Sequence, residues 1–280
     1  MSSRIQEILA KAEREGMTRG NQAAPAAPAA ATTSARGASP FMQAPVITTP
    51  PLDARTATAP SLQVTEPRTA RAALDPSLVA ALAPHSIAAE RYRAVRTRIS
   101  QREEDVPLRS LLVTSPSSGD GKSVTAANLA LTMAQEFQRS VVLVDGDLRT
   151  SSIHALFGLE PQPGLTEVLM GEASLDDALV YLPDHRLTVL PAGGTPQFPS
   201  ELLGSAAMRR TIDVLRARFD RILLDTPPVM PLADTGTVAP LADGVLMVVR
   251  AGVTQRPALE QALTVFEEQK VVGVVLNDAN

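Results

Sequence analysis

The segment that most constrains the fold of this chain is Thr114–Ser123, which reads TSPSSGDGKS. It follows a short apolar run and precedes a stretch with helical character, which is the setting of a P-loop. In a P-loop, successive backbone N–H groups and the start of a helix point at phosphate oxygens. Pro116 stands where the first glycine of the motif is usual, but the final Gly-Lys-Ser is intact. The sequence therefore predicts a phosphate site, which we name the P-loop, rather than an ordinary Gly-rich turn.

The residue types within the P-loop fit separate roles. The two glycines supply the backbone freedom that wrapping around a phosphate requires. The lysine brings a positive charge to the β- and γ-phosphates, and the serine hydroxyl after it can ligate Mg²⁺. The predicted nucleotide-binding residues of this segment are Ser118, Gly119, Asp120, Gly121, Lys122, Ser123 and Val124.

Three acidic residues follow apolar runs further along the chain. Asp145 and Asp147 come just after VVLV, and Asp225 comes after ILL. In open parallel sheets ligands lie at the carboxyl ends of the strands, so these acids and the P-loop should share one crevice. Asp225 occupies the place of a Walker B aspartate, which holds Mg²⁺ through its water shell. The residues alone therefore predict metal binding by Ser123 and Asp225.

The order of strand and helix patterns predicts the fold class. Apolar runs predict strands at 110–114, 140–145, 187–190, 221–225, 244–249 and 271–276. Helices are predicted at 122–136, 200–218 and 256–270, with shorter ones around Ile153 and Leu175. The strands are continuously apolar rather than alternating, which is typical of parallel strands covered on both faces. We therefore expect an α/β fold with a doubly wound, mainly parallel sheet of the P-loop NTPase type.

The chain ahead of this pattern differs in composition. Residues 1–16 predict a short amphipathic helix, in which Ser3 and Gln6 fit a capping box. That helix is either a docking element or a peptide too short to be stable alone. Residues 17–74 are rich in Ala and Pro and predict a disordered linker.

The predicted domain therefore spans residues 75–280. Asp75 followed by a proline marks a first helix start. Ser86 marks a second, whose helix runs to about residue 100. Its apolar face is predicted to consist of Ala88, Tyr92, Val95 and Ile99.

Composition excludes several classes of function. The chain has no Cys, which rules out a disulfide framework, a thiolate zinc site, a cysteine nucleophile and an iron–sulfur cluster. A formal charge of −4 does not favour binding to nucleic acid. No apolar run approaches the roughly 20 residues that span a bilayer, and no signal peptide opens the chain. We therefore expect a cytoplasmic protein without a membrane span.

Several separated motifs resemble one known family. They are the variant P-loop, VVLVDGDLR after residue 140, ILLDTPP after residue 221 and a helix that reads ERYRAVR. Connecting stretches such as PAGGTPQFPSELL and LADGVLMVVRAG fit as well. From about Asp75 to Asn280 the chain resembles the bacterial tyrosine kinases (BY-kinases) of capsule and exopolysaccharide synthesis.

This resemblance implies a function and a set of roles. The chain would be an ATP- and Mg²⁺-dependent protein-tyrosine kinase that regulates polysaccharide polymerisation and export. Lys122, Asp145 and Asp147 would be catalytic, with Asp145 as the candidate general base. Asp145 and Asp147 would assist metal placement and the incoming hydroxyl, so that the implied metal site is Ser123, Asp145 and Asp225. Asn277 would contact the adenine.

The resemblance also implies partners. Glu90, Arg93 and Arg96 match the family's oligomerisation motif and would face a neighbouring subunit in a homo-oligomeric ring. A membrane protein that sets polysaccharide chain length would activate the kinase and hold it at the inner face of the cell membrane.

The sequence departs from the family in its tyrosines. Tyr92 and Tyr181 are the only two, and no tyrosine cluster follows the last predicted strand. Three alternatives therefore stay open: transfer to another protein, limited modification of these two tyrosines, or an ATPase switch or nucleotide-gated scaffold without tyrosine phosphorylation. A partition or division-site ATPase is disfavoured, because Ser117 stands where that class carries an extra lysine.

Overall fold

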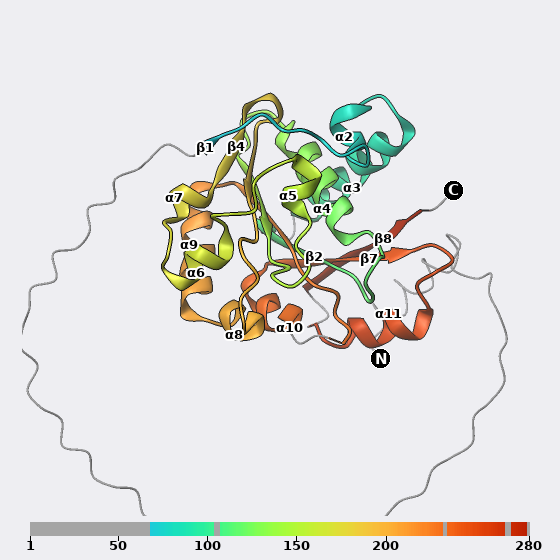
Figure 1. Ribbon diagram of the computed structural model, residues 1–280. Helices are drawn as coiled ribbons and strands as arrows, with labels where there is room; N and C mark the ends of the chain where they lie inside the picture. The colour runs from blue at the N-terminus through green and yellow to red at the C-terminus, as the bar shows by residue number, and fades with distance from the viewer. Residues whose placement is uncertain (1–67, 104–106, 232–233, 267–269, 279–280) are drawn as a thin grey trace, which may run out of the picture. The chain divides into compact units, whose positions relative to one another are not determined.

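The computed structural model describes residues 68–103, 107–231, 234–266 and 270–278 (Figure 1). These residues contain an eight-stranded sheet with the order β1-β4-β5-β3-β6-β2-β7-β8. All neighbouring strands are parallel except β4 and β5, which are antiparallel. The strands are β1 (Arg68–Thr69), β2 (Ser110–Thr114), β3 (Val141–Asp145), β4 (Val180–Leu182), β5 (Leu187–Leu190), β6 (Arg221–Asp225), β7 (Gly244–Arg250) and β8 (Val271–Asn277).

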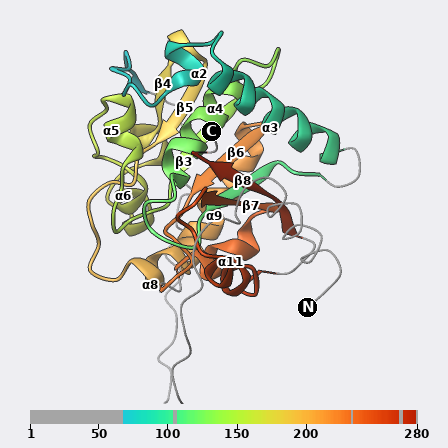
Figure 2. The same ribbon diagram turned by 90° about the vertical axis from the view of Figure 1, so that its right-hand side faces the viewer.

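Helices cover both faces of this sheet, which confirms the predicted doubly wound architecture (Figures 1 and 2). One face packs against α2 (Val79–Leu82), α3 (Ile87–Glu103), α4 (Lys122–Ala134) and α5 (Ile153–Phe157). The other face packs against α6 (Leu165–Met170), α7 (Leu175–Ala178), α8 (Pro199–Leu203), α9 (Ala206–Arg218), α10 (Asp234–Val238) and α11 (Arg256–Leu263). Two short 3₁₀ helices, η2 (Pro183–His185) and η3 (Ala239–Leu241), complete the elements.

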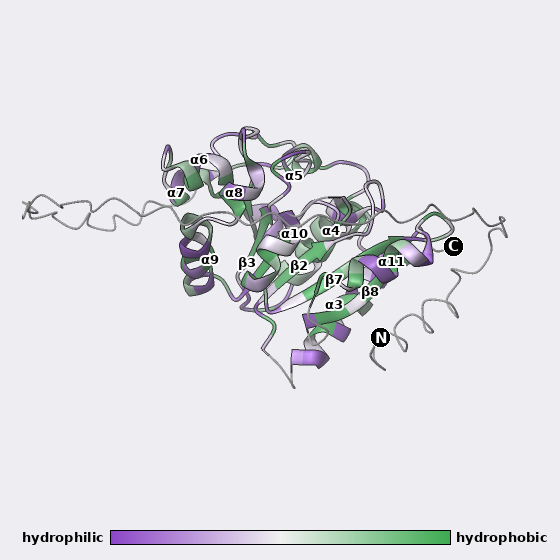
Figure 3. Cartoon of the chain, turned by 90° about the horizontal axis from the view of Figure 1, so that it is seen from below, coloured by the Kyte–Doolittle hydropathy of each residue, from purple (hydrophilic) through white to green (hydrophobic). Residues whose placement is uncertain are grey.

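The central strands are apolar on both sides because both sides are buried. In β3, Val142 and Val144 belong to the core layer under α9, whereas Val141 and Leu143 belong to the layer under α4. Figure 3 shows the same arrangement, with mostly green strands lying between helices that carry both purple and green residues. The six predicted strands are confirmed to within one residue at each end.

Three predicted helices have different bounds. The helix predicted at 122–136 ends two residues earlier, at Ala134. The helix predicted at 200–218 is two helices, because Ser205 interrupts it and caps α9 by accepting a hydrogen bond from the Met208 N–H at 3.2 Å. The helix predicted at 256–270 ends at Leu263, and residues 267–269 lie outside the described part.

The helix predicted from Ser86 is α3, and the Ser86 hydroxyl caps it by accepting from the Ala89 N–H at 3.1 Å. Its buried face contains Ala89 and Ile99, whereas Ala88 is exposed. The prediction of Ala88 for this face was therefore wrong by one position.

The ordered domain begins before residue 75, so the predicted end of the linker at residue 74 is wrong. β1 pairs with β4, and Ala70, Ala72 and Leu74 pack against the core. Small alanine side chains carry little hydrophobic signal, which explains why this segment reads as linker. The first helix begins at Val79 rather than at residue 76, because Asp75 accepts the Ser77 N–H in a local turn.

The remaining N-terminal predictions, a helix at 1–16 and a linker up to residue 67, lie outside the described residues. Within the described part, no helix is long and apolar enough to cross a membrane.

Candidate active site

Three neighbouring central strands bring the predicted site residues together at their carboxyl ends. The strand order places β3, β6 and β2 side by side, and all three run in the same direction. The P-loop follows β2, while Asp145 and Asp225 end β3 and β6 and are paired in register. Residues far apart in sequence therefore meet at the carboxyl ends of these strands, as the motif positions predicted.

The P-loop turns through two glycines with left-handed backbone conformations, Gly119 at φ 86° and Gly121 at φ 90°. Lys122 is the first residue of α4, so the helix N-terminus faces the loop. A Cβ atom on Gly121 would lie 2.1 Å from the Nδ2 atom of Asn277, which leaves room only for glycine. Ser118 and Gly119 are exposed at the outer bend, where a phosphate can reach them.

Asp120 acts within the loop rather than at its surface, since only 2% of the residue is exposed. Its Oδ2 atom accepts the Ser117 N–H at 3.0 Å, and its Oδ1 atom accepts the Thr254 hydroxyl at 2.7 Å. Asp120 therefore holds the loop's shape through its carboxylate. Thr254 lies in the turn after β7, and no motif in the sequence pointed to it.

Asn277 lies at the end of β8 and touches the P-loop from the side. Its Nδ2 atom donates to the carbonyl oxygen of Asp120 at 3.0 Å. The structure thus places this predicted adenine-contacting residue directly beside the nucleotide-binding loop. Val124, the last residue of the predicted set, lies in the first turn of α4 and is half-buried.

Lys122 lies among the carboxylates. Its Nζ atom is 2.9 Å from Oδ2 of Asp147 and 3.7 Å from Oδ2 of Asp225, and it also donates to the Ser123 hydroxyl at 3.1 Å. Burial disfavours the charged ammonium group, but the two aspartates outweigh this effect and raise the pKa of Lys122. The lysine is therefore charged and is held by the acids when no nucleotide is bound.

Asp225 is completely buried. Its Oδ2 atom accepts the Ser123 hydroxyl at 2.5 Å, while its Oδ1 atom is buried without a hydrogen-bond partner. Burial raises the pKa of Asp225 to about 6, although Lys122 and Ser123 act in the opposite direction. An unpartnered buried carboxylate oxygen is costly, and a bound cation or water would satisfy it.

Asp145 is also fully buried, and both of its oxygens accept backbone N–H groups. Oδ1 accepts from Asp147 at 3.2 Å, and Oδ2 accepts from Ile153 at 3.1 Å. Burial, followed by the nearby charge of Asp225, raises the pKa of Asp145 to about 8. The two neighbouring strand ends thus hold two carboxyl groups whose ionisation is disfavoured.

Asp147 differs from these two acids because it is surrounded by donors. Besides Lys122, it accepts from the Thr150 N–H at 2.9 Å and from the Thr150 hydroxyl at 3.0 Å. Burial opposes its ionisation, but Lys122 and the Thr150 bonds prevail and lower the pKa of Asp147. Asp147 is therefore the ionised carboxylate that pairs with the lysine.

Arg149, which ends the second acidic motif, forms a further cluster beside the site. Its Nε atom is 2.6 Å from Oδ2 of the buried Asp234, and the Ser200 hydroxyl bonds to the same carboxylate. Asp234 is in α10 and Ser200 in α8, so this cluster ties both helices to the loop after β3. Asp234 and Ser200 were not predicted, because neither belongs to a recognisable motif.

The residues predicted for oligomerisation lie on α3, away from these acids. Glu90 pairs with Arg93 at 2.6 Å, and 70% of the Glu90 side chain is exposed. Arg96 is turned towards α4, where it donates to the Thr132 carbonyl at 3.0 Å and pairs with Glu136 at 3.3 Å. Glu90 and, in part, Arg93 are accessible to another molecule, whereas Arg96 is mostly used within the chain.

Comparison with known proteins agrees with this geometry. Residues 111–280 match the family described as the CobQ/CobB/MinD/ParA nucleotide binding domain. The tyrosine-protein kinase YwqD of Bacillus subtilis is 35% identical over 203 residues, which cover 72% of this chain and 85% of that protein. The chain belongs to the bacterial tyrosine-protein kinase family. The predicted family is therefore confirmed, and with it the assignment to ATP-dependent phosphotransferases.

Other relatives give the same result. The tyrosine-protein kinase CpsD of Streptococcus agalactiae is 35% identical over 68% of this chain and 83% of its own length. Among solved structures, the kinase domain of the Escherichia coli tyrosine kinase ETK has a TM-score of 0.70 and 27% identity, and the alignment covers 74% of this chain and 82% of that one. The chimerical protein CapA2B2 has a TM-score of 0.68 and 29% identity, over 76% of this chain and 93% of that one.

Proposed function

We propose that the chain is a Mg²⁺- and ATP-dependent protein-tyrosine kinase that regulates the polymerisation and export of exopolysaccharide or capsule. The observation that carries the proposal is the convergence of Lys122 and Ser123, the last two residues of the P-loop, with Asp225. The lysine supplies a charge for the β- and γ-phosphates, and the other two supply oxygen ligands. The family membership supports the choice of tyrosine as acceptor.

The side chains present fit a magnesium ion. The Asp225 Oδ1 atom is buried without a partner, and the Ser123 hydroxyl lies beside the same carboxylate. Within the described ranges, no three or more His, Cys, Asp or Glu side chains are grouped so that they could hold a metal ion by themselves. Mg²⁺ commonly keeps several waters and binds through one or two carboxylates plus substrate phosphates, so Ser123 and Asp225, with Asp145 nearby, would hold it. The bound ion would neutralise charge that develops on the phosphate oxygens.

The chain's own residues would position the phosphates and the acceptor. Backbone N–H groups of the P-loop and the start of α4 bind the phosphates, and Lys122 exchanges its contact with Asp147 for phosphate oxygens. That exchange releases the Asp147 carboxylate, which then orients the incoming hydroxyl. Asp145 is the proposed general base, and with a pKa of about 8 only its ionised fraction can accept the proton of the hydroxyl at neutral pH. Because Asp145 is fully buried, the hydroxyl reaches it only after a rearrangement of the site.

The proposal is tested by peptide mass spectrometry on the full chain after incubation with Mg-ATP, together with a measurement of ADP release. The sample includes a tyrosine-bearing membrane partner as a second possible acceptor. Phosphotyrosine should appear with the unaltered chain and be absent with Lys122→Met. Lys270→Met changes a lysine remote from the P-loop and should leave phosphorylation unchanged. ADP release without any phosphotyrosine would refute the kinase and favour the ATPase switch or nucleotide-gated scaffold.

The proposed cellular context is the cytoplasmic face of the membrane, with a membrane protein that sets polysaccharide chain length as partner. The family resemblance supports this context. Co-purification of the chain with such a partner from detergent-solubilised membranes tests it. Recovery of the chain without the partner, in the presence and absence of nucleotide, would contradict it.

We also propose that the chain assembles as a ring through α3, with Glu90 as the main intersubunit contact. Its exposure supports this role, and Arg93 lies beside it. Native mass spectrometry of the full chain should show a smaller assembly for Glu90→Lys than for the unaltered chain. Glu172→Lys, at an exposed position after α6, is the matched control. An unchanged assembly size in Glu90→Lys would refute this contact.

A further inference from the structure

A cavity of about 360 Å³ lies where the strands of the sheet begin, at the end opposite to the P-loop. Ser140 and Asp220, which precede β3 and β6, line it, and so does Thr188 near the start of β5. The nucleotide site, in contrast, follows the ends of β3 and β6. Because a five-residue strand spans roughly 17 Å, the two sites are separate. The volume is within the range of cavities that bind small organic groups.

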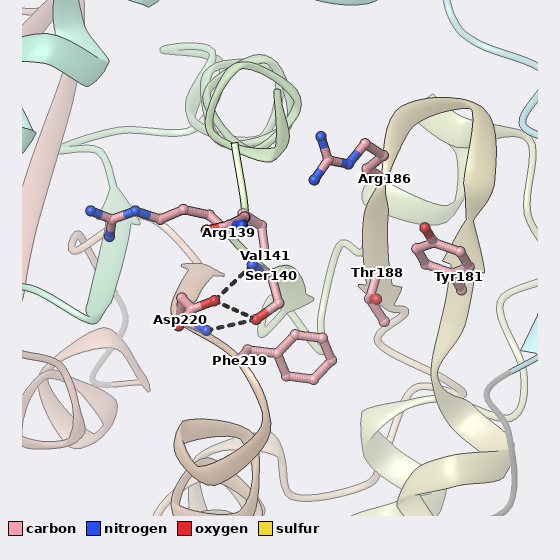
Figure 4. A pocket seen from close by; sticks show the side chains of 9 residues that line it. Arg139, Ser140, Val141, Tyr181, Arg186, Thr188, Phe219 and Asp220 are labelled. Carbon is pink, nitrogen blue, oxygen red and sulfur yellow. Dashed lines mark hydrogen bonds between the residues drawn. The ribbon is translucent and has the colours of Figure 1, made fainter. Parts of the chain in front are cut away.

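Aromatic and hydroxyl side chains form the wall of this cavity. Tyr181 of β4 and Thr188 of β5 are paired in register, so both side chains lie on the same face of the sheet. Phe219, which follows α9, reaches the cavity from the other side (Figure 4). Within the described residues, the hydroxyls of Tyr181 and Thr188 make no hydrogen bond. They are therefore available to a ligand that enters between the aromatic rings.

The charges at the rim favour an anion. Arg186 extends from the β4–β5 hairpin towards the segment of Arg139 and Ser140 (Figure 4). Among the residues that the structure describes, its guanidinium group has no ion-pair partner. Arg139, by comparison, pairs with Glu136 at 3.4 Å.

The one carboxylate that lines the cavity, Asp220, is satisfied locally. It accepts the Ser140 N–H at 2.8 Å and the Ser140 hydroxyl at 2.7 Å, and these bonds lower its pKa. Asp220 stays ionised, and the arginines whose charges act on it are Arg139 and Arg109. Among the described residues, Arg186 is therefore left without a carboxylate of its own.

Backbone strain marks the same place. Three residues other than glycine have a positive φ within the described chain, and two of them, Gln138 at 58° and Arg186 at 53°, line this cavity. Such conformations are costly and concentrate at ligand-binding and switch regions. Arg186 takes this conformation as the C-cap of η2, and both residues contribute to the lining of the cavity.

We propose that this cavity binds the phosphotyrosine side chain of a peptide. The phenyl ring would lie against Phe219, and the phosphate would contact Arg186 and the free hydroxyls of Tyr181 and Thr188. Arginine forms bidentate, charge-assisted hydrogen bonds with phosphate, which makes it the main determinant of binding. The aromatic wall and the arginine at the rim favour a ligand with an aromatic ring and a negative charge. The choice of phosphotyrosine rests on the proposed kinase function, because a tyrosine kinase forms this group. The cavity would thus hold phosphorylated protein near the kinase without occupying its nucleotide site.

The test is a fluorescence anisotropy titration of the full chain with a labelled synthetic phosphotyrosine peptide, its unphosphorylated twin and a phosphoserine analogue. Mg-ADP is present in excess so that the P-loop cannot take the phosphate. The phosphotyrosine peptide should bind at least tenfold more tightly than the other two. Since no phosphoryl transfer takes place, the result does not depend on whether the chain is an active kinase.

Variants locate the binding. Arg186→Gln changes an exposed side chain and should weaken binding by about tenfold or more, as expected for the loss of a charge-assisted hydrogen bond. Arg210→Gln, an exposed arginine of α9 outside the cavity, should leave binding unchanged. Equal binding of the three peptides, or unchanged binding by Arg186→Gln, would overturn the proposal. Binding that Lys122→Met abolishes and Arg186→Gln does not would also overturn it, because the phosphate would then lie in the P-loop.

Discussion

Replacing Lys122 should destabilise the nucleotide-free protein as well as abolish phosphoryl transfer. The lysine is the cation that faces three carboxyl groups, those of Asp145, Asp147 and Asp225. Asp225 is completely buried and only 1% of the Asp147 side chain is exposed, so neither can turn to water when the lysine is lost. Removing one partner of a buried ion pair typically costs 3–5 kcal/mol. We expect Lys122→Met to lose about 3 kcal/mol of the free energy of unfolding at pH 8.

This loss should depend on pH in a specified direction. Without the lysine, the pKa values of Asp147 and Asp225 rise, so both carboxyl groups are protonated at a higher pH than in the unaltered chain. The folded-state pKa of Asp225 is already about 6 with the lysine present, so at pH 5.5 Asp225 is mostly neutral in the variant. A neutral acid needs no counter-charge, and the destabilisation should therefore shrink as the pH falls from 8 to 5.5.

Urea denaturation of the nucleotide-free protein at both pH values measures this effect. Lys122→Met combined with Asp147→Asn should recover part of the loss at pH 8, because the second change removes a carboxylate that would otherwise be unpaired. Lys270→Met is the matched control and should change the unfolding free energy little. The reasoning is refuted if Lys122→Met is as stable as the unaltered chain at pH 8, or if its loss is the same at both pH values.

Three further predictions concern the same site. Gly121→Ala should lower the melting temperature of the nucleotide-free protein more than Gly119→Ala does. Both changes strain a left-handed backbone by about 1–2 kcal/mol, but only the Cβ atom at position 121 would meet Asn277. Equal shifts in melting temperature would contradict this. Burial raises the pKa of Asp145 to about 8, above its unfolded value, so this group makes the unaltered chain less stable as the pH rises from about 4 to 8. Relative to the unaltered chain, Asp145→Asn should gain up to about 1.4 kcal/mol of unfolding free energy per pH unit in urea denaturation. A difference that does not depend on pH would argue against the raised pKa. Thr254→Val removes the hydroxyl donor to the buried P-loop carboxylate and should weaken nucleotide binding several-fold in calorimetry, and an unchanged affinity would mean that this bond does not order the loop.

The strands were predictable because burial on both faces leaves a continuous apolar signature. β3 and β7 show it clearly, and their predicted bounds agree with the structure to within a residue. β4 lacked it, since three residues between a short helix and a turn are too few for a pattern. β1 was missed for a different reason: its Arg-Thr sequence is exposed, and its place in the sheet depends on backbone pairing with β4 and on a bond from Arg68 to the Asp177 carbonyl oxygen.

The site was predictable where chemistry is carried by motifs that end strands. The P-loop and the three acids converge as their positions indicated. What the sequence could not show is how each acid is partnered, because that depends on side chains from distant segments. Thr254 reaches Asp120 across 134 residues, and Asp234 reaches Arg149 across 85. These contacts decide which carboxylates are used within the protein and which are left for a ligand.

The bonds of Asp120 connect the nucleotide loop to the outer edge of the sheet. Its side chain is held from the turn after β7, and its carbonyl oxygen is held by Asn277 at the end of the edge strand β8. A shift of the P-loop that exceeds the range of hydrogen-bond lengths must therefore break these bonds or move the ends of β7 and β8 as well. A molecule that binds β8 and favours one position of Asn277 changes the affinity for nucleotide. By thermodynamic reciprocity, bound nucleotide changes the affinity for that molecule by the same factor. A partner protein that binds the edge strand β8 can therefore change nucleotide affinity without contacting the nucleotide site.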